Sequence, residues 1–307
     1  ALNDSVLTSN IDFVTSLNVS SLFISDLTGI EDFVMLSSLE CADNQLLSLD
    51  ISNNYNLTGL ICYRNSIGSL DVSNNLLLTQ LDCAENLISS LDVSFNTNLF
   101  RIVCHANQIS TLDLSNNLLL TTLNCADNQI SNLDVTQNLL LEDFICSVNQ
   151  ISNLDVTFNT ALWRIYCNNN YIQTLDVSNN LLLKELHCGG NQISNLNLLQ
   201  NNILEDLLCA GNLLTTLDLT NNPLLWRVFC SSNQLSSLDV SNNLLLKQLQ
   251  CNGNQISNLN LNQNVLLEDL ICSGNLLTSL ELYNNPLVYR LLCSSNQLID
   301  LDLTLNT

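Results

Sequence analysis

Cysteine is the residue with the greatest capacity for chemistry in this 307-residue chain, and it recurs at a fixed interval. The 13 cysteines occupy every twenty-first position from Cys41 to Cys293. Cysteines can pair as disulfides, bind metal ions or take part in redox reactions. However, the count is odd, and no CxxC pair or Cys/His pair has the spacing of a metal site. We therefore expect free thiols that are buried at one repeated inward position and act as small hydrophobic side chains.

Catalysis requires an acid, a base and a nucleophile that converge, and the sequence offers little for such a group. His105 and His187 are the only histidines, and they lie four 21-residue units apart at different places relative to the cysteine. No phosphate loop, nucleophile motif or metal-ligand spacing is present. We therefore expect a protein that is not an enzyme and that has no catalytic residues.

Aspartate forms a second column, nine residues after the cysteine. Its ten members are Asp50, Asp71, Asp92, Asp113, Asp134, Asp155, Asp176, Asp218, Asp239 and Asp302, with Asn197, Asn260 and Glu281 in the remaining places. We expect each carboxylate to accept a hydrogen bond from a neighbouring Ser or backbone N–H and to form a solvated acidic face. Calcium held between carboxylates is the alternative, because hard cations bind oxygen ligands. No other cofactor or metal is expected.

Two columns before the cysteine carry a longer period of 63 residues. The positions four and three residues before the cysteine are aromatic and Arg in every third unit, and six of the seven basic residues lie in these two columns. The position directly before the cysteine is mostly apolar, although a solvated strand face should be polar there. From these columns we predict a contact surface made of Phe100, Arg101, Trp163, Arg164, Tyr166, His187, Trp226, Arg227, Phe229, Tyr289 and Arg290.

Three occupants of this surface remain open from the residues alone. Aromatic side chains spaced by three units, about 14 Å, could stack on an extended polysaccharide. Trp, Tyr and Arg are also the residues that dominate binding to proteins. Two copies of the chain could instead associate through the same face as a scaffold. In the acid–base columns, ion pairs are expected between neighbouring units, as for Asp143 with Arg164, Asp206 with Arg227 and Lys184 with Glu205.

These columns are positioned by the secondary structure of a single 21-residue unit, which is repeated along almost the whole chain. Leu, Cys and Asn recur in the pattern LxxLxCxxNxLxxLDVSxNxx, in which two short segments, L-x-C and L-D-V, alternate inward and outward. Neither segment can bury its apolar side alone, so the units must stack. We predict a mostly β solenoid with little helix, gently curved, in which each 21-residue coil has two short parallel strands and Asn turns both corners. The Asn side chains should hydrogen-bond the backbone of the next coil and so form two ladders, one per corner. Thirteen coils give a rod of roughly 60 Å.

This pattern resembles that of leucine-rich repeat proteins of the nested 21-residue type. The segment "VTSLNVSSLFISDLTGIEDFVMLSSLEC" is similar to the first repeat of internalin-like and Bacteroidetes secreted proteins, with Val19 in the place of the cysteine. We assign residues 1–38 to an N-terminal capping repeat and residues 39–307 to about thirteen repeats, the last of them truncated and followed natively by further chain. The resemblance implies a secreted or surface-attached bacterial protein with an adhesive or recognition role.

The charge balance limits the partners further. The formal net charge is −22, which argues against nucleic acid and against anionic lipid, because both bind basic surfaces. No apolar run approaches the roughly 20 residues of a membrane span, so no direct membrane insertion is expected. We therefore expect a protein, a polysaccharide or a second copy of the chain as partner.

Overall fold

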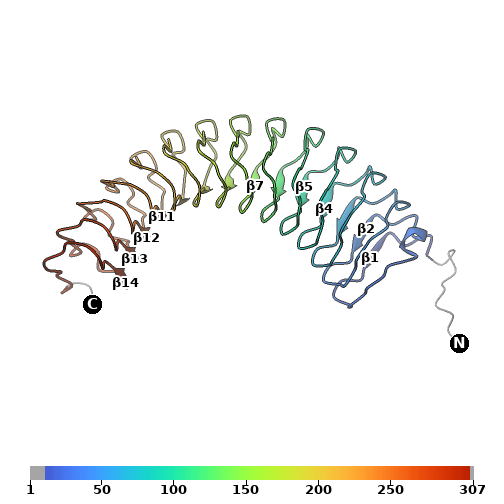
Figure 1. Ribbon diagram of the computed structural model, residues 1–307, viewed down its shortest axis with the longest axis horizontal. Coiled ribbons are helices and arrows are strands. Elements are labelled where there is room, and N and C mark those ends of the chain that lie inside the picture. The colour runs from blue at the N-terminus through green and yellow to red at the C-terminus, as the bar shows by residue number, and fades with distance from the viewer. Residues whose placement is uncertain (1–10, 305–307) are drawn as a thin grey trace. The chain divides into compact units, whose positions relative to one another are not determined.

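A computed structural model describes residues 11–304 of the chain, which forms two units, Ala1–Gln150 and Ile151–Thr307. Each unit is a stack of coils with one short strand per coil (Figure 1). The strands of the first unit are β1 (Ser16–Asn18), β2 (Ser38–Glu40), β3 (Gly59–Ile61), β4 (Gln80–Asp82), β5 (Arg101–Val103), β6 (Thr122–Asn124) and β7 (Asp143–Ile145). Those of the second unit are β8 (Arg164–Tyr166), β9 (Glu185–His187), β10 (Asp206–Leu208), β11 (Arg227–Phe229), β12 (Gln248–Gln250), β13 (Asp269–Ile271) and β14 (Arg290–Leu292).

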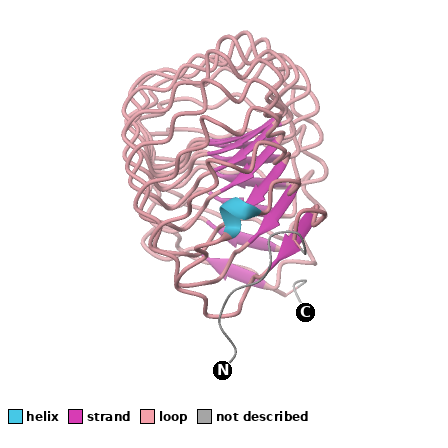
Figure 2. Ribbon diagram, turned by 90° about the vertical axis from the view of Figure 1, so that its right-hand side faces the viewer, coloured by secondary structure: helices cyan, strands magenta, loops and turns pink. Residues whose placement is uncertain are grey.

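Within each unit the strands form a parallel sheet in sequence order. Leu186 on β9 lies beside Leu207 on β10, and Leu207 lies beside Val228 on β11, each 21 residues further on. The constant interval places every residue over its counterpart in the next coil, so each column of the sequence becomes a ladder in space. The strands lie along one side of the coils (Figure 2). Apart from the one-turn 3-10 helix η2 (Ile30–Asp32), residues 11–304 contain no helix. The predicted mostly β solenoid of 21-residue repeats is therefore confirmed.

The core is the inside of the coils. In the coil of Cys83 the inward side chains are Leu78, Leu81, Cys83, Ile88, Leu91 and Val93, of which none is more than 4% exposed. Burying each large aliphatic side chain contributes about 1.5–3 kcal/mol, and only stacking against the neighbouring coils makes this burial possible. The core therefore runs along each stack and leaves the outward side chains free for other roles.

The prediction of two strands per coil was wrong for the described residues. The L-D-V segment alternates as expected, since Leu91 and Val93 are buried and Asp92 is exposed, but it is not a strand. Its backbone bends at once into a turn, because the N–H of Ser94 donates to the carboxylate of Asp92 at 2.9 Å. The N–H of Asn96 then donates to the carbonyl of Val93 at 3.0 Å. These local hydrogen bonds use backbone donors that a ladder between coils would need.

Asparagine forms the two predicted ladders, although its hydrogen bonds run to the preceding coil rather than to the next. The amide of Asn86 donates to the carbonyl of Cys62 at 3.0 Å and accepts from the N–H of Ile67 at 3.0 Å. At the other corner, Asn75 donates to the carbonyls of Ile51 and Asn54 at 3.0 and 2.9 Å. Each Asn thereby satisfies buried backbone groups that no strand pairing reaches.

The N-terminal segment joins the first sheet with one extra residue. Leu17 on β1 lies beside Leu39 on β2, an offset of 22 residues, and the N–H of Val19 donates to the carbonyl of Glu40 at 2.8 Å. The 3-10 turn η2 follows. Asn54 of the next coil holds this turn in place by donating a hydrogen bond to the carbonyl of Ile30 at 2.9 Å. The expected truncation of the last coil falls on residues 305–307, outside the described part of the chain.

Candidate functional site

The outward face of strands β8 to β11 gathers most of the predicted contact residues in the second unit. In each three-residue strand the middle side chain is buried in the core, and the first and third side chains project outward. Because the register is constant, outward residues of neighbouring strands lie side by side, as Tyr166, His187, Leu208 and Phe229 do. We call this surface the strand face.

Asp206 on β10 is the polar centre of the strand face. The residue is 3% exposed, and its carboxylate accepts two hydrogen bonds from the guanidinium of Arg227, one of them from Nε to Oδ1 at 2.7 Å. The imidazole Nε2 of His187 lies 2.9 Å from Oδ2 of the same carboxylate. Burial alone would raise the pKa of Asp206, but the hydrogen bonds from Arg227 and His187 outweigh it and lower the pKa. Asp206 is therefore a buried anion that fixes two side chains from the strands on either side.

Tyr166 extends this network from β9 to the neighbouring strand β8. Its ring stacks on that of His187, with centroids 3.9 Å apart and planes inclined by 4°, and its hydroxyl donates to the carboxylate of Glu185. Burial and this hydrogen bond to an anion raise the pKa of Tyr166 to about 12. Tyr166 is consequently neutral and held rigidly at physiological pH.

The two tryptophans of the second unit each lie beneath an arginine. The guanidinium carbon of Arg164 is 4.9 Å from the ring centroid of Trp163 and 5.2 Å from that of Tyr166. Arg227 repeats the arrangement at 4.9 Å from Trp226 and 5.6 Å from Phe229. Both tryptophans are half-buried, so each arginine covers one ring face through a cation–π contact.

The structure therefore brings together seven of the eleven predicted contact residues and leaves four outside the cluster. The clustered residues are Trp163, Arg164, Tyr166, His187, Trp226, Arg227 and Phe229. Tyr289 is 74% exposed and precedes β14, where Arg290 reaches Asp269 at 3.3 Å. Phe100 and Arg101 belong to the first unit, where Arg101 begins β5.

The predicted ion pairs between coils are confirmed for Asp206 with Arg227 and for Lys184 with Glu205, whose charged atoms are 3.2 Å apart. The pair of Asp143 and Arg164 joins residues of different units and stays a prediction. Lys184 and Glu205 are both substantially exposed, so their pair contributes roughly 0–1 kcal/mol. Glu185 and Asp206 were not among the residues predicted for the contact surface, although both are acids in the column that carries the arginines.

The cysteine column is a ladder of free thiols, as predicted. Twelve of the cysteines are buried and Cys293 is half-buried. Burial raises the pKa of Cys125, Cys188 and Cys230 to about 12, far from the range in which a thiolate forms at neutral pH. Among residues 11–304, no group of three or more His, Cys, Asp or Glu side chains is arranged to hold a metal ion.

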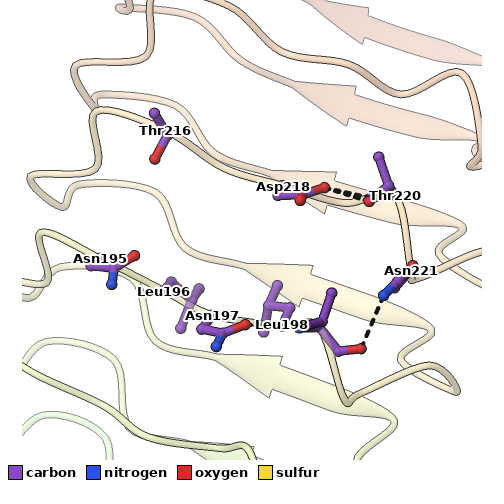
Figure 3. Close-up of a pocket in the computed structure, with 9 residues that line it drawn as sticks. Asn195, Leu196, Asn197, Leu198, Thr216, Asp218, Thr220 and Asn221 are labelled. Carbon is purple, nitrogen blue, oxygen red and sulfur yellow. Dashed lines mark hydrogen bonds between the residues drawn. The ribbon is translucent and has the colours of Figure 1, made fainter.

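The aspartate column behaves as a set of turn-forming carboxylates. All ten accept a hydrogen bond from the backbone N–H two residues later. In the second unit, Asp218 of this column lines a pocket together with residues of the preceding coil, such as Asn197 (Figure 3). There Asp218 binds both the N–H of Thr220 at 3.0 Å and its hydroxyl at 2.6 Å. These hydrogen bonds from Thr220 lower the pKa of Asp218. The predicted role in local hydrogen bonding is confirmed, and calcium binding stays a hypothesis.

The predicted contact surface did not include a second apolar surface, which lies at the corner before many of the strands. Of the three consecutive leucines in Leu76–Leu78, only Leu78 is buried, whereas Leu76 and Leu77 are 52% and 47% exposed. The signal was present, because the inward pattern needs one leucine at this corner and the sequence supplies three.

Solved structures with the same coil geometry are known. No protein-family model matches the sequence, and no curated protein matches it. The functional domain of InlJ from Listeria monocytogenes, which includes a cysteine ladder, superimposes with a TM-score of 0.96 at 35% identity, covering 98% of this chain and 67% of that one. An internalin, InlF, from the same species matches with a TM-score of 0.79 at 23% identity, covering 100% and 88%. A leucine-rich repeat protein of Leptospira interrogans matches with a TM-score of 0.72 at 19% identity, and the match covers 95% of this chain and 92% of that one.

The coil geometry defines a leucine-rich repeat solenoid, and the two more distant structures support that fold alone. At 35% identity over nearly the whole chain, with a shared cysteine ladder, the first match is more specific. The chain belongs to the internalin-like family of leucine-rich repeat proteins. Within residues 11–304 no helix is long and apolar enough to cross a membrane.

Proposed function

We propose that this chain is an extracellular, non-enzymatic interaction module that binds a protein partner through the strand face of β8–β11. The observation that carries the proposal is the cluster around Asp206, in which Tyr, Arg and His side chains on β8, β9 and β11 and the Trp side chains directly before β8 and β11 are fixed by contacts with one another. Such residues dominate binding energy at protein interfaces, and side chains ordered in advance lose little entropy on binding. The secreted or cell-surface location and the adhesive role rest on the internalin-like family.

A protein partner fits this surface better than a polysaccharide does. Sugar rings bind by stacking on free aromatic faces. Here Arg164 covers a face of Trp163, Arg227 covers a face of Trp226, and His187 covers a face of Tyr166. The parts of these half-buried side chains that remain exposed offer mixed apolar and hydrogen-bonding contacts, which suit the side chains of another protein.

The test compares two variants on arrays of extracellular proteins and of glycans. Trp163→Ala/Trp226→Ala should weaken binding to the protein hits at least about thirtyfold, because a central aromatic contributes roughly 2 kcal/mol or more. Tyr171→Ala/Tyr283→Ala is the matched control, since both rings are about half exposed at other positions of the coil. The control should bind like the unaltered chain.

Two outcomes would contradict the proposal. One is unchanged binding by a tryptophan double variant whose circular dichroism and melting temperature show an intact fold. The other is binding to glycans alone that the same variant loses, which would assign the strand face to a polysaccharide.

A further inference from the structure

A row of exposed leucines, interrupted in some coils, lies along the corner of the coils that leads into the strands. In the first unit its members lie fourteen and fifteen residues after the cysteine and are 47–54% exposed: Leu76, Leu77, Leu118, Leu119, Leu139 and Leu140. In the second unit the same row consists of Leu181, Leu182, Leu224, Leu244, Leu245 and Leu287. The core does not require these side chains, because the next residue in each coil, such as Leu120, fills the inward position. We call this surface the leucine ridge.

The leucine ridge is also free of charge. The five positions from eleven to fifteen residues after each cysteine contain no Asp, Glu, Lys or Arg in any coil from residue 52 to residue 287. Elsewhere the chain carries a formal net charge of −22. Two copies of so acidic a chain repel each other over most of their surface, and the ridge is where they can approach at the lowest electrostatic cost.

The area of the ridge is that of an interface rather than of scattered surface residues. At about half exposure, the six leucines of the first unit present on the order of 600 Å² of apolar surface together with two neighbouring rings. These rings are Tyr55, which takes the place of a leucine in its coil, and Phe95, which lies two residues before that place in its own coil. Monomeric proteins rarely expose a contiguous apolar patch of more than a few hundred Å². A stable interface buries about 800 Å² on each partner, so the ridge of one unit supplies most of what a dimer needs.

The spacing of the ridge identifies its occupant. Leucine pairs are one or two coils apart in the first unit and three coils apart in the second, with gaps where, for example, Thr97 and Asn98 or Thr160 and Ala161 replace them. A rigid surface can match this spacing over several coils only if its own contacts have the same spacing, and a second copy of the chain has it by construction. A two-fold axis would place the same ridge on both sides of the contact.

We infer that the leucine ridge is a self-association surface through which two copies of this chain pack edge to edge. The contact is separate from the strand face, which stays open for another partner. Because it is apolar and uncharged, the association strengthens as salt screens the repulsion between the acidic chains.

Sedimentation equilibrium of the full chain tests the inference with two variants of equal charge. Leu118→Glu/Leu139→Glu should weaken the dimer at least about a hundredfold, since two carboxylates per copy enter an apolar contact. Gln108→Glu/Gln129→Glu adds the same charge to the same two coils at exposed positions of the opposite corner, and should dimerise like the unaltered chain. A chain that is monomeric at about 100 μM in 0.15 M salt, or equal weakening by both variants, would overturn the inference.

Cross-linking gives a second readout that does not depend on tolerance of the glutamates. In a Cys293→Ser background, the other cysteines are buried, so an added Leu118→Cys is the reactive thiol. A bis-maleimide should convert this variant to a covalent dimer and leave the Gln108→Cys control monomeric. Equal cross-linking of both, or a monomer that instead floats with phosphatidylcholine vesicles through the same leucines, would refute a second copy as the occupant.

Discussion

The rings of Tyr166 and His187 lie face to face with their centroids 3.9 Å apart, although the two residues are 21 positions apart in the sequence. The stack exists because a constant register sets the third residue of β8 beside the third residue of β9. The same rule turns each column of the sequence into a ladder, so a substitution in one coil acts on its neighbours.

Asp206→Asn should destabilise the second unit at neutral pH by about 1–3 kcal/mol, because a neutral amide replaces the anion that binds Arg227 and His187. The folded-state pKa of Asp206 is lowered, so its contribution is present above the unfolded-state pKa near 4 and is lost as the pH falls through the folded value. Urea unfolding followed by circular dichroism should show a difference from the unaltered chain that is full at pH 7 and shrinks below pH 4. A difference independent of pH would contradict this.

Asn86→Ala should be among the most damaging single substitutions, with a loss of about 2–4 kcal/mol. The Asn86 side chain is 6% exposed, donates to three backbone carbonyls and accepts from the N–H of Ile67. The exposed Asn74, with one hydrogen bond to the carbonyl of Ser52 at 3.2 Å, is the control, and Asn74→Ala should cost under about 0.5 kcal/mol. Similar urea midpoints for the two variants would show that the buried asparagine contributes no more to stability than the exposed one.

Val148→Gly should stabilise the first unit by about 1 kcal/mol. Val148 has φ 56°, in the left-handed region that a β-branched side chain strongly disfavours. The equivalent residue Gly211 has φ 67°, and Gly211→Val should destabilise the second unit by about 1–2 kcal/mol through the same strain. Thermal unfolding of the two variants should shift in opposite directions, and a shift of the same sign in both would argue against backbone strain as the cause.

One cysteine per chain should react with Ellman's reagent in the native protein at pH 8, and the others only after unfolding. Cys293 is half-buried, whereas burial raises the pKa of thiols such as Cys41 and Cys272 to about 12 and excludes the reagent. Cys293→Ser should abolish the fast reaction without changing the total released in denaturant by more than one thiol. Rapid reaction of several native thiols would contradict a closed core.

The sequence alone predicted that the aspartates accept local hydrogen bonds, because the donor lies two residues later in the same coil. It also predicted the repeat, the inward cysteines and both asparagine ladders, because these depend on contacts between successive coils. A period of 21 fixes those contacts before any coordinate is known. It also indicated the columns that become the strand face. The second strand was predicted wrongly, since the alternation of Leu91, Asp92 and Val93 gives burial but not the hydrogen bonds of the backbone.

Only the tertiary structure decided which outward side chains contact one another, and which of them contact more than one neighbour. That Asp206 binds Arg227 from the next strand and His187 from the previous one, while Arg227 also covers Trp226, depends on rotamers and on burial that a column of letters does not contain. The same holds for the leucine ridge, because the sequence "LLL" does not show which leucine turns inward until the corner is closed by Asn75. Periodicity determined which residues are neighbours, and packing determined what those neighbours do.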